Sequence, residues 1–298
     1  RKTVTPQLRL DQGDSYLLLV DLGAGKNRMG GSSVAQVFNQ LGNEAPDVDN
    51  PQQLKGFFNA MQELVEDQKL LAYHDRSDGG LFSTVTEMAF AGHCGVNVNL
   101  DALGKDDGAA LFNEELGAVL QVRNQDRAAV NAVLKRHGLE NVSHEIGAPT
   151  KAATIEFYRN QKKVLADSWT NYRKLWAQTT HHIQSLRDNP TTAAEELKQK
   201  LDLQDPGLQA YTTFAMNVPK VTVNGPRPKI AILREQGTNG HNEMAAAFNR
   251  AGFTCVDVHM SDILSGKVDL KEFRGLVAAG GFSYGDVLGA GRGWAMTI

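Results

Sequence analysis

The stretch "NGPRPKIAILREQGTNGHNEMAAAFNRAGFTCVDVH", residues 224–259, decides the fold of the C-terminal part of the chain. Within it, "KIAIL" predicts a buried strand and "HNEMAAAFNRAG" a helix that stops at Gly252. "TCVDVHM" (254–260), which begins within it, predicts a second strand. A third apolar run, "GLVAAGG", begins at Gly275. A strand, a helix and two further strands in this order are typical of a doubly wound α/β domain with a parallel sheet.

Two adjacent glycines follow the third of these predicted strands. In "AAGGFSYGDVLGAG" (278–291), Gly280, Gly281 and Gly285 allow the backbone to turn sharply and to expose N–H groups. An oxyanion hole needs such donors about 3 Å from the developing charge. The spacing by itself leaves two alternatives open, an oxyanion loop and an ordinary turn of an α/β sheet.

The first part of the chain, residues 1–160, predicts an α+β domain, because strand patterns and helix patterns both occur in it. The expected strands are "SYLLLVDL" (15–22), "LLAYH" (70–74), "GVNVNL" (95–100), "GAVLQV" (117–122) and "KAATIEF" (151–157). The expected helices cover residues 33–42, 51–71, 81–91 and 126–138.

Between these two domains, residues 161–226 predict a helical connector. Its apolar residues lie near helical spacing, and few strand signals interrupt them. These residues are Val164, Leu165, Trp169, Tyr172, Trp176, Ile183 and Leu186. The expected organisation is therefore a domain at 1–160, a connector at 161–226 and a second domain at 227–298.

Length and composition exclude several classes of protein. The 298 residues suffice for about two domains. The net charge of −3, with Lys and Arg scattered, does not indicate a partner nucleic acid, and no apolar run has the length of a membrane span. Two cysteines predict a reducing compartment, so we expect a cytoplasmic protein.

Both ends of the sequence are unusual for a complete protein. The chain begins with Arg1 and Lys2, and its last residues, "GWAMTI", have the pattern of a helix without a stop signal. We therefore expect a segment of a longer polypeptide, whose remainder is a partner of this chain.

A glycine-rich loop, "GAGKNRMGGSS" (23–33), follows the first predicted strand. It matches neither a P-loop nor the dinucleotide-binding pattern. Gly30, Gly31 and Ser32 nevertheless precede a predicted helix, where free N–H groups attract phosphate. An anion site and an ordinary strand-to-helix turn both remain possible. We expect Ser32 or Ser33 to cap this helix, whose apolar face contains Val34, Val37, Phe38 and Leu41.

A second turn, in "HDRSDGGLFSTVTEMAFAG" (74–92), carries more polar groups than a helix cap requires. Asp75, Ser77 and Asp78 stand between a strand and a helix. Carboxylates in such a turn can hold Mg²⁺, which prefers oxygen ligands and bridges to phosphates, and Ser77 could donate to a phosphate oxygen. The alternative is that one of the three residues only caps the helix.

The remaining titratable residues favour structural roles. We expect Cys94 to be a packed core residue and Cys255 to be buried in a strand. His181 and His182 have no partner at metal-ligand spacing, which predicts a solvated face. An acidic stretch is expected to be exposed to solvent. It consists of Asp101, Asp106, Asp107, Glu114 and Glu115.

Taken together, four stretches resemble the phosphoribosylformylglycinamidine synthase family, the large single-chain formylglycinamide ribonucleotide amidotransferases. They are "DLGAGKNRMGGSSVAQV", "HDRSDGGL", "LREQGTNGHNEMAAAF" and "AAGGFSYGDVLGAG". The resemblance covers the whole chain. It implies that residues 1–160 are the C-terminal domain of an aminoimidazole ribonucleotide synthetase-like half, and that residues 227–298 are the first part of a class I glutaminase domain.

The resemblance also implies an activity. In the family, a glutaminase domain releases ammonia through a Cys-His-Glu triad, and a synthetase domain uses ATP and Mg²⁺ to activate the formyl amide oxygen of formylglycinamide ribonucleotide. The positions that match are Asp75 as a Mg²⁺ ligand, Ser77 as a nucleotide contact, and Gly281 with Phe282 as backbone donors of the oxyanion hole. The small-molecule substrates are formylglycinamide ribonucleotide, glutamine and ATP.

The resemblance places the triad Cys, His and Glu outside this chain, so we expect the segment to have no glutaminase activity. It also places the N-terminal part of the synthetase half outside. The alternative from another class is a noncatalytic nucleotide-binding or scaffolding module that shares these domains.

Overall fold

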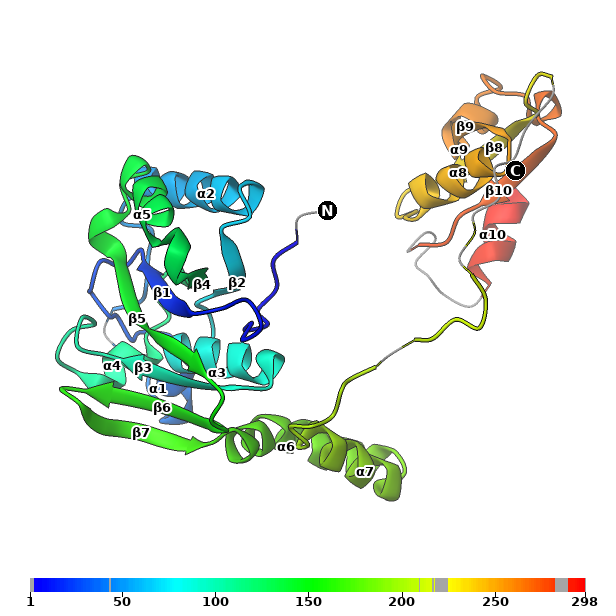
Figure 1. The fold of residues 1–298 in the computed structure, drawn as a ribbon. Coiled ribbons are helices and arrows are strands. Elements are labelled where there is room, and N and C mark those ends of the chain that lie inside the picture. Colours follow the sequence, from blue (N-terminus) through cyan, green and yellow to red (C-terminus); the bar gives the residue numbers. More distant parts are fainter. Residues whose placement is uncertain are drawn as a thin grey trace. The chain divides into compact units, whose positions relative to one another are not determined.

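The computed structural model describes residues 3–42, 44–208, 210–215, 217, 225–281 and 289–297. The chain forms two compact units, residues 1–208 and residues 209–298. The first contains a mixed sheet with helices on both faces, and the second contains a small parallel sheet (Figure 1). No helix in the described ranges combines the length and the apolar character needed to cross a bilayer.

The sheet of the first unit has seven strands in the order β2-β4-β1-β5-β3-β6-β7. Neighbouring strands are antiparallel except for β3 and β6, which run parallel. The expected α+β class is therefore confirmed. The strands are β1 (Ser15–Asp21), β2 (Leu70–Asp75), β3 (Gly95–Asn99), β4 (Gly117–Arg123), β5 (Ser143–Thr150), β6 (Thr154–Arg159) and β7 (Lys162–Ser168).

Helices cover both faces of this sheet, because its central strands bury side chains on both sides. In β1, Leu17 and Leu19 belong to one core cluster, whereas Tyr16, Leu18 and Val20 belong to the other. This alternation follows from the two-residue period of a strand. Two layers of helices are consequently needed to keep β1 from water.

The first core cluster is covered by α3 and by the start of α6, and the second by α2 and α5 (Figure 1). The helices of this unit are α1 (Ser33–Val37), α2 (Pro51–Glu66), α3 (Gly80–Gly92), α4 (Asp107–Phe112), α5 (Arg127–Arg136), α6 (Trp169–Arg187) and α7 (Pro190–Lys200). Two short 3-10 helices, η1 (Asn124–Asp126) and η2 (Glu140–Val142), flank α5.

Residues 162–168 were expected to begin a helical connector, but they form strand β7. Their side chains are all exposed or half-buried, so the sequence carries no alternating apolar signal. The helical part starts with Trp169, which is 1% exposed and donates from Nε1 to the carbonyl of Ala89 (3.0 Å). Helices α6 and α7 thus belong to the first unit.

The short helix α1 also differs from expectation. Ser32 caps it, as predicted, by accepting a hydrogen bond from Ala35 N. The helix ends at Val37, and Asn39 adopts a left-handed backbone conformation (φ 54°) that turns the chain away. The expected apolar face is therefore wrong, because Val37, Phe38 and Leu41 are 75%, 70% and 82% exposed.

The second unit confirms the predicted βαβ arrangement followed by a strand. Its three strands are parallel in the order β10-β8-β9. Helix α8 connects β8 to β9 along the chain. The elements are β8 (Lys229–Arg234), α8 (His241–Arg250), β9 (Thr254–His259), α9 (Met260–Leu264), η3 (Leu270–Glu272), β10 (Gly275–Ala278) and α10 (Ala290–Thr297).

Candidate functional site

Asp75 is the last residue of β2, and its carboxylate is exposed at the end of the sheet. The hydroxyl of Tyr73 donates to Asp75 Oδ1 at 2.5 Å. Burial raises the pKa of Tyr73, and this hydrogen bond raises it further, so the phenol keeps its proton and acts as a donor. One carboxylate oxygen of Asp75 is thereby fixed in position, while the side chain remains open to solvent.

The turn after Asp75 leads into α3 without using a side chain as a cap. Gly79 occupies the N-cap position in a left-handed conformation (φ 79°), and the N-cap position supplies no side-chain cap hydrogen bond. Ser77 and Asp78 are exposed. The capping alternative therefore does not account for Asp75, Ser77 and Asp78, and the polar groups of this turn remain available for a ligand.

Glycine is required within this turn by close packing. A Cβ atom on Gly80 would lie 2.5 Å from the carbonyl oxygen of Asn113 and 2.8 Å from that of Leu111. The Gly-Gly pair thus allows the start of α3 to sit directly against the segment that leads from α4 to β4.

The glycine-rich loop is held by its own hydrogen bonds. The amide of Gly30 donates to Glu44 O (2.6 Å), that of Gly31 to Leu41 O (2.7 Å), and that of Ser32 to Met29 O (3.2 Å). The Ser32 hydroxyl caps α1 and donates to the same carbonyl of Met29 (2.7 Å). Because these donors already have acceptors, the geometry favours the ordinary turn over an anion site.

Glu114 links the two turns that the sequence singled out. Its Oε1 accepts hydrogen bonds from the amide of Ser33 (2.8 Å) and from the amide of Gly79 (2.8 Å). The start of α1 and the start of α3 therefore lie next to each other. Sequence reasoning assigned Glu114 to a solvent-exposed acidic stretch, but it is half-buried and connects the site.

Glu115 was expected to be exposed as well, and this expectation is wrong. Its side chain is 1% exposed and accepts from Arg28 through Nε (2.7 Å) and Nη2 (2.8 Å). Arg28 also donates to Asp49 (2.8 Å). A buried carboxylate needs such a bidentate partner to offset its desolvation. Asp101 and Asp106 of the same stretch are exposed, as predicted, and Asp107 is half-buried beside Arg159.

A second buried ion pair lies beneath the Asp75 turn. Arg76 donates to Asp21 Oδ1 (2.5 Å), and the two side chains are 1% and 4% exposed. Arg76 also donates to the carbonyls of Glu115 (2.6 Å) and Leu116 (3.1 Å). Asp21 in turn accepts from the amides of Gly23 and Gly25. Arg76 thus points into the protein, whereas its neighbours Asp75 and Ser77 point outward.

Sequence reasoning did not find Asp21 or Arg76. Asp21 follows a run of apolar residues at the end of a strand, which is a signal for a functional or structural carboxylate. Arg76 stands between two residues that were singled out, but nothing in the spacing shows that it is buried.

The residues present fit a Mg²⁺ ion only if a phosphate ligand completes its coordination. Among the described residues, no group of three His, Cys, Asp or Glu side chains is placed to hold a metal ion. Mg²⁺ often keeps water and binds through one or two carboxylates together with substrate phosphates. The single exposed carboxylate of Asp75 is compatible with that mode, and an all-protein metal cage is not.

In the second unit, Gly281 lies against the loop that follows β8. It forms an isolated bridge with Thr238 rather than a regular ladder, and Asn239 N donates to Gly280 O (3.2 Å). A Cβ atom on Gly281 would lie 2.5 Å from Gly237 O. The position therefore requires glycine. Phe282, the other expected oxyanion donor, lies outside the described residues.

The cysteines have structural roles in the folded chain. Cys94 is 2% exposed, and burial raises the pKa of its thiol to about 12, which confirms a packed core residue. Cys255 is half-buried rather than fully buried, and its Sγ donates to the carbonyl of Ala245 (3.2 Å). Of the histidine pair, His182 is exposed as predicted, whereas His181 is half-buried.

Two family models match the chain. The AIR synthase related protein, C-terminal domain, matches residues 13–159, and the CobB/CobQ-like glutamine amidotransferase domain matches residues 227–298. These ranges correspond to the seven-stranded and three-stranded sheets, apart from strand β7.

Solved structures show a distant likeness. Thermotoga maritima PurL complexed with ATP shares 13% identity, covering 76% of this chain and 32% of that chain, with a TM-score of 0.45. PurLQS from Thermotoga maritima shares 12% identity, covering 84% and 33%, also with a TM-score of 0.45. The hydrogenase maturation protein HypE of E. coli shares 20% identity, covering 56% and 52%, with a TM-score of 0.40.

The chain spans about a third of the length of the PurL chains that it matches. The two family models match separate parts of the chain and leave residues 160–226 between them. The chain therefore contains an AIR synthase-related C-terminal domain followed by a CobB/CobQ-like glutamine amidotransferase domain.

Proposed function

We propose that the chain is part of a phosphoribosylformylglycinamidine synthase. The complete enzyme is a carbon–nitrogen ligase of purine biosynthesis, which converts formylglycinamide ribonucleotide, glutamine, ATP and water to the amidine, glutamate, ADP and phosphate. The order of the two matched domains supports this proposal. The two cysteines are free, which is compatible with a cytoplasmic protein. Under this proposal, the partner of the chain is the rest of the same polypeptide.

In the first unit, the proposal assigns Asp75 to a Mg²⁺–nucleotide complex. The single observation that carries this step is that Asp75 and Ser77 are exposed beside the start of α3 and are not used as caps. The carboxylate would hold the cation, which neutralises phosphate charge when it is bound, and the Ser77 hydroxyl would donate to a phosphate oxygen. The amides of Gly30, Gly31 and Ser32 donate to backbone carbonyls of the chain rather than to the ligand. Glu114 joins the following residue, Ser33, to Gly79 of the adjoining turn.

In the second unit, the proposal assigns the backbone N–H of Gly281, with that of Phe282, to an oxyanion hole. Such donors stabilise the negative oxygen that forms when a nucleophile attacks the glutamine amide. The packing of Gly281 against the loop that follows β8 supports a fixed donor direction. Neither cysteine of the chain is suited to be the nucleophile, because Cys94 is buried and Cys255 donates to a carbonyl within the fold.

The nucleotide step can be tested by calorimetry on the 298-residue chain with ADP, in the presence and absence of Mg²⁺. Asp75→Asn should weaken Mg²⁺-dependent binding about tenfold or more, because a charge-assisted contact is worth roughly 1.5–3 kcal/mol. Asp78→Asn is the matched control, because it removes one exposed carboxylate from the same turn.

If Asp75→Asn and Asp78→Asn lost the same amount of ADP affinity, the loss would reflect only the removal of surface charge. That result would overturn the role of Asp75. Binding that does not depend on Mg²⁺ would overturn the cation assignment. The chain should also release no ammonia from glutamine. Measurable glutamine hydrolysis that persists in a Cys94→Ser, Cys255→Ser variant would show a nucleophile that the proposal does not contain.

A further inference from the structure

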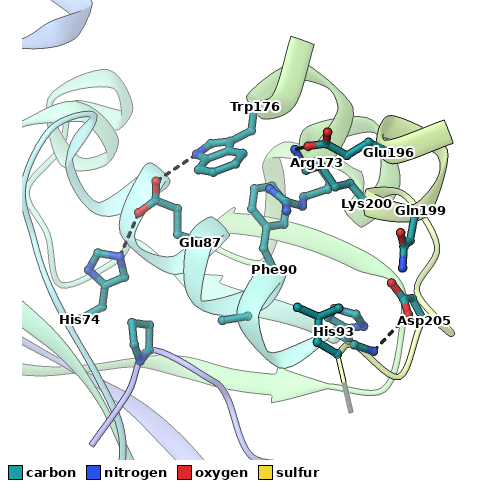
Figure 2. Close-up of a pocket in the computed structure, with 14 residues that line it drawn as sticks. His74, Glu87, Phe90, His93, Arg173, Trp176, Glu196, Gln199, Lys200 and Asp205 are labelled. Atoms are coloured by element: carbon teal, nitrogen blue, oxygen red, sulfur yellow. Dashed lines mark hydrogen bonds and ion pairs between the residues drawn. The ribbon is translucent and has the colours of Figure 1, made fainter. Parts of the chain in front are cut away.

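A cleft of about 660 Å³ lies in the first unit, and neither Asp75 nor Ser77 of the proposed nucleotide site lines it. Helices α3, α6 and α7 form its walls (Figure 2). Its volume is within the range of about 300–1,000 Å³ that is usual for small-molecule sites. The charged and aromatic side chains labelled in the figure that matter for its chemistry are His74, Glu87, Phe90, Arg173, Trp176 and Lys200.

The carboxylates of the cleft already have partners. Glu87 accepts from His74 Nε2 (2.9 Å) and from Trp176 Nε1 (3.0 Å). Glu196 forms an ion pair with Lys200, and Asp205 accepts from the amide of Gly207 (3.1 Å). Because the negative groups are paired with donors of the protein, they do not make the cleft a cation site.

Arg173 is different from the other charged groups. Within the described residues, no carboxylate lies within ion-pair distance of its guanidinium, and no acceptor forms a hydrogen bond with it. The guanidinium lies 4.6 Å from the ring centre of Trp176 and 5.4 Å from that of Phe90. Burial lowers the pKa of Arg173, which is the effect expected when no anion is close.

The two rings hold the guanidinium in place. Arg173 and Trp176 project from the same helix, three residues apart, and Trp176 is fixed through its hydrogen bond to Glu87 (Figure 2). Phe90 packs edge-to-face near Trp176, with ring centres 6.3 Å apart. Residue Trp176 is 57% exposed, so part of its surface remains free at the cleft.

We propose that this cleft binds a small anion, a carboxylate or a phosphate ester, that carries an aromatic body. The anionic group pairs with the planar fork of Arg173, which matches the two oxygens of a carboxylate or phosphate. The aromatic body packs against the exposed part of Trp176 and the apolar floor near Phe90. The site is independent of the proposed function, because none of its anion-binding groups belongs to the Asp75 turn.

The inference can be tested by calorimetry on the whole chain with four probes: benzoate, phenyl phosphate, inorganic phosphate and benzyl alcohol. Benzoate and phenyl phosphate should both bind with saturation, and the neutral benzyl alcohol should bind far more weakly. Arg173→Gln should weaken both anions about tenfold or more, because a charge-assisted bidentate contact is lost.

Lys174→Gln is the matched control, since it removes a positive charge from the neighbouring, exposed position of α6 outside the cleft. Its binding should stay within about twofold of the unmodified chain, the range expected for an exposed charge. Arg173→Lys keeps the charge but loses the fork, and it should lie between these two variants. It also serves as the second test if Arg173→Gln does not fold, which circular dichroism would reveal.

Three results would overturn the inference. One is the absence of saturable binding of both aromatic anions at millimolar concentration. Another is an equal loss in Arg173→Gln and Lys174→Gln. The third is equal affinity for benzoate and benzyl alcohol, which would show that the negative charge of the ligand does not contribute to binding. If inorganic phosphate bound as tightly as phenyl phosphate, the proposal that the ligand carries an aromatic body would be wrong.

Discussion

The two units of the chain are each built on a sheet, but they bury very different amounts of it. In the first unit, helices cover both faces, and residues such as Leu19 and Leu120 have exposures of 1% and 0%. In the second, the described buried cluster consists of Ala231, Leu233 and Val258, and α8 has no buried residue. The first unit can therefore enclose charged pairs, whereas the second keeps its charged pairs in water.

The difference in burial between the two units should change how much stability is lost when one partner of an ion pair is removed. In the first unit, Arg76 and Asp21 are 1% and 4% exposed, and in the second, Arg234 and Asp257 are 37% and 56% exposed. Arg76→Met should destabilise the first unit by about 3–5 kcal/mol, because it leaves the Asp21 carboxylate buried without its partner. Arg234→Met should change the second unit by only about 0–1 kcal/mol.

Hydrogen exchange measured by mass spectrometry can follow the two units separately, through peptides from β1 and from β8. Faster exchange in β1 of Arg76→Met, with little change in β8 of Arg234→Met, is the expected pattern. If both variants changed protection equally, burial would not be the property that separates the units.

Much of the fold could be predicted because apolar patterns report burial directly. The strand at 15–22 and the βαβ pattern at 229–259 have that signal, and the structure confirms both. Strand β7 lacks it, because its side chains are exposed or half-buried at the edge of the sheet. The exposure of Val37 and Phe38 shows the converse failure, in which apolar spacing exists without a partner surface.

The site was harder to predict, because charge patterns do not report burial. Glu114 and Glu115 are neighbours in an acidic stretch, yet one links two turns and the other is buried against Arg28. These contacts join residues between 35 and 87 positions apart in sequence, so no local spacing reveals them. Asp75 and Ser77 were found because a turn with several polar groups and two glycines has a local signal.

A comparison of Gly281→Ala with Gly280→Ala tests whether the second unit depends on the close contact between Gly281 and Gly237. Gly281→Ala would place a Cβ atom 2.5 Å from Gly237 O, whereas a Cβ atom on Gly280 meets nothing within 4 Å. We expect Gly281→Ala to destabilise the second unit by about 1–3 kcal/mol, the range for a strained backbone position, and Gly280→Ala to have a smaller effect.

Exchange of the Asn239 amide, which donates to Gly280 O, is a direct probe of this contact. It should become faster in Gly281→Ala because the loop that follows β8 must move. Unchanged exchange in Gly281→Ala would mean that the contact between the two loops is not needed for the order of the unit.

The smallest expected effect concerns two His–Glu pairs, one in each unit. His74 and Glu87 are joined by a hydrogen bond of 2.9 Å, whereas His259 and Glu235 are 4.0 Å apart, beyond hydrogen-bond distance. The hydrogen bond to Glu87 raises the pKa of His74 in the folded chain, even though partial burial opposes it. A raised histidine pKa stabilises the fold below the unfolded value, and this stability is lost as the pH rises through the folded pKa.

Thermal melting should therefore show a steeper loss of stability from about pH 6 to about pH 8 in the unmodified chain than in Glu87→Gln. The amide of Gln can still accept from Trp176 Nε1, so the variant removes the charge and keeps a hydrogen bond in the cleft. Glu235→Gln, at the longer contact, should leave the pH dependence nearer to that of the unmodified chain. The contrary result would be that the melting temperatures of Glu87→Gln and of the unmodified chain change with pH in parallel. The hydrogen bond between His74 and Glu87 would then not couple protonation of His74 to folding.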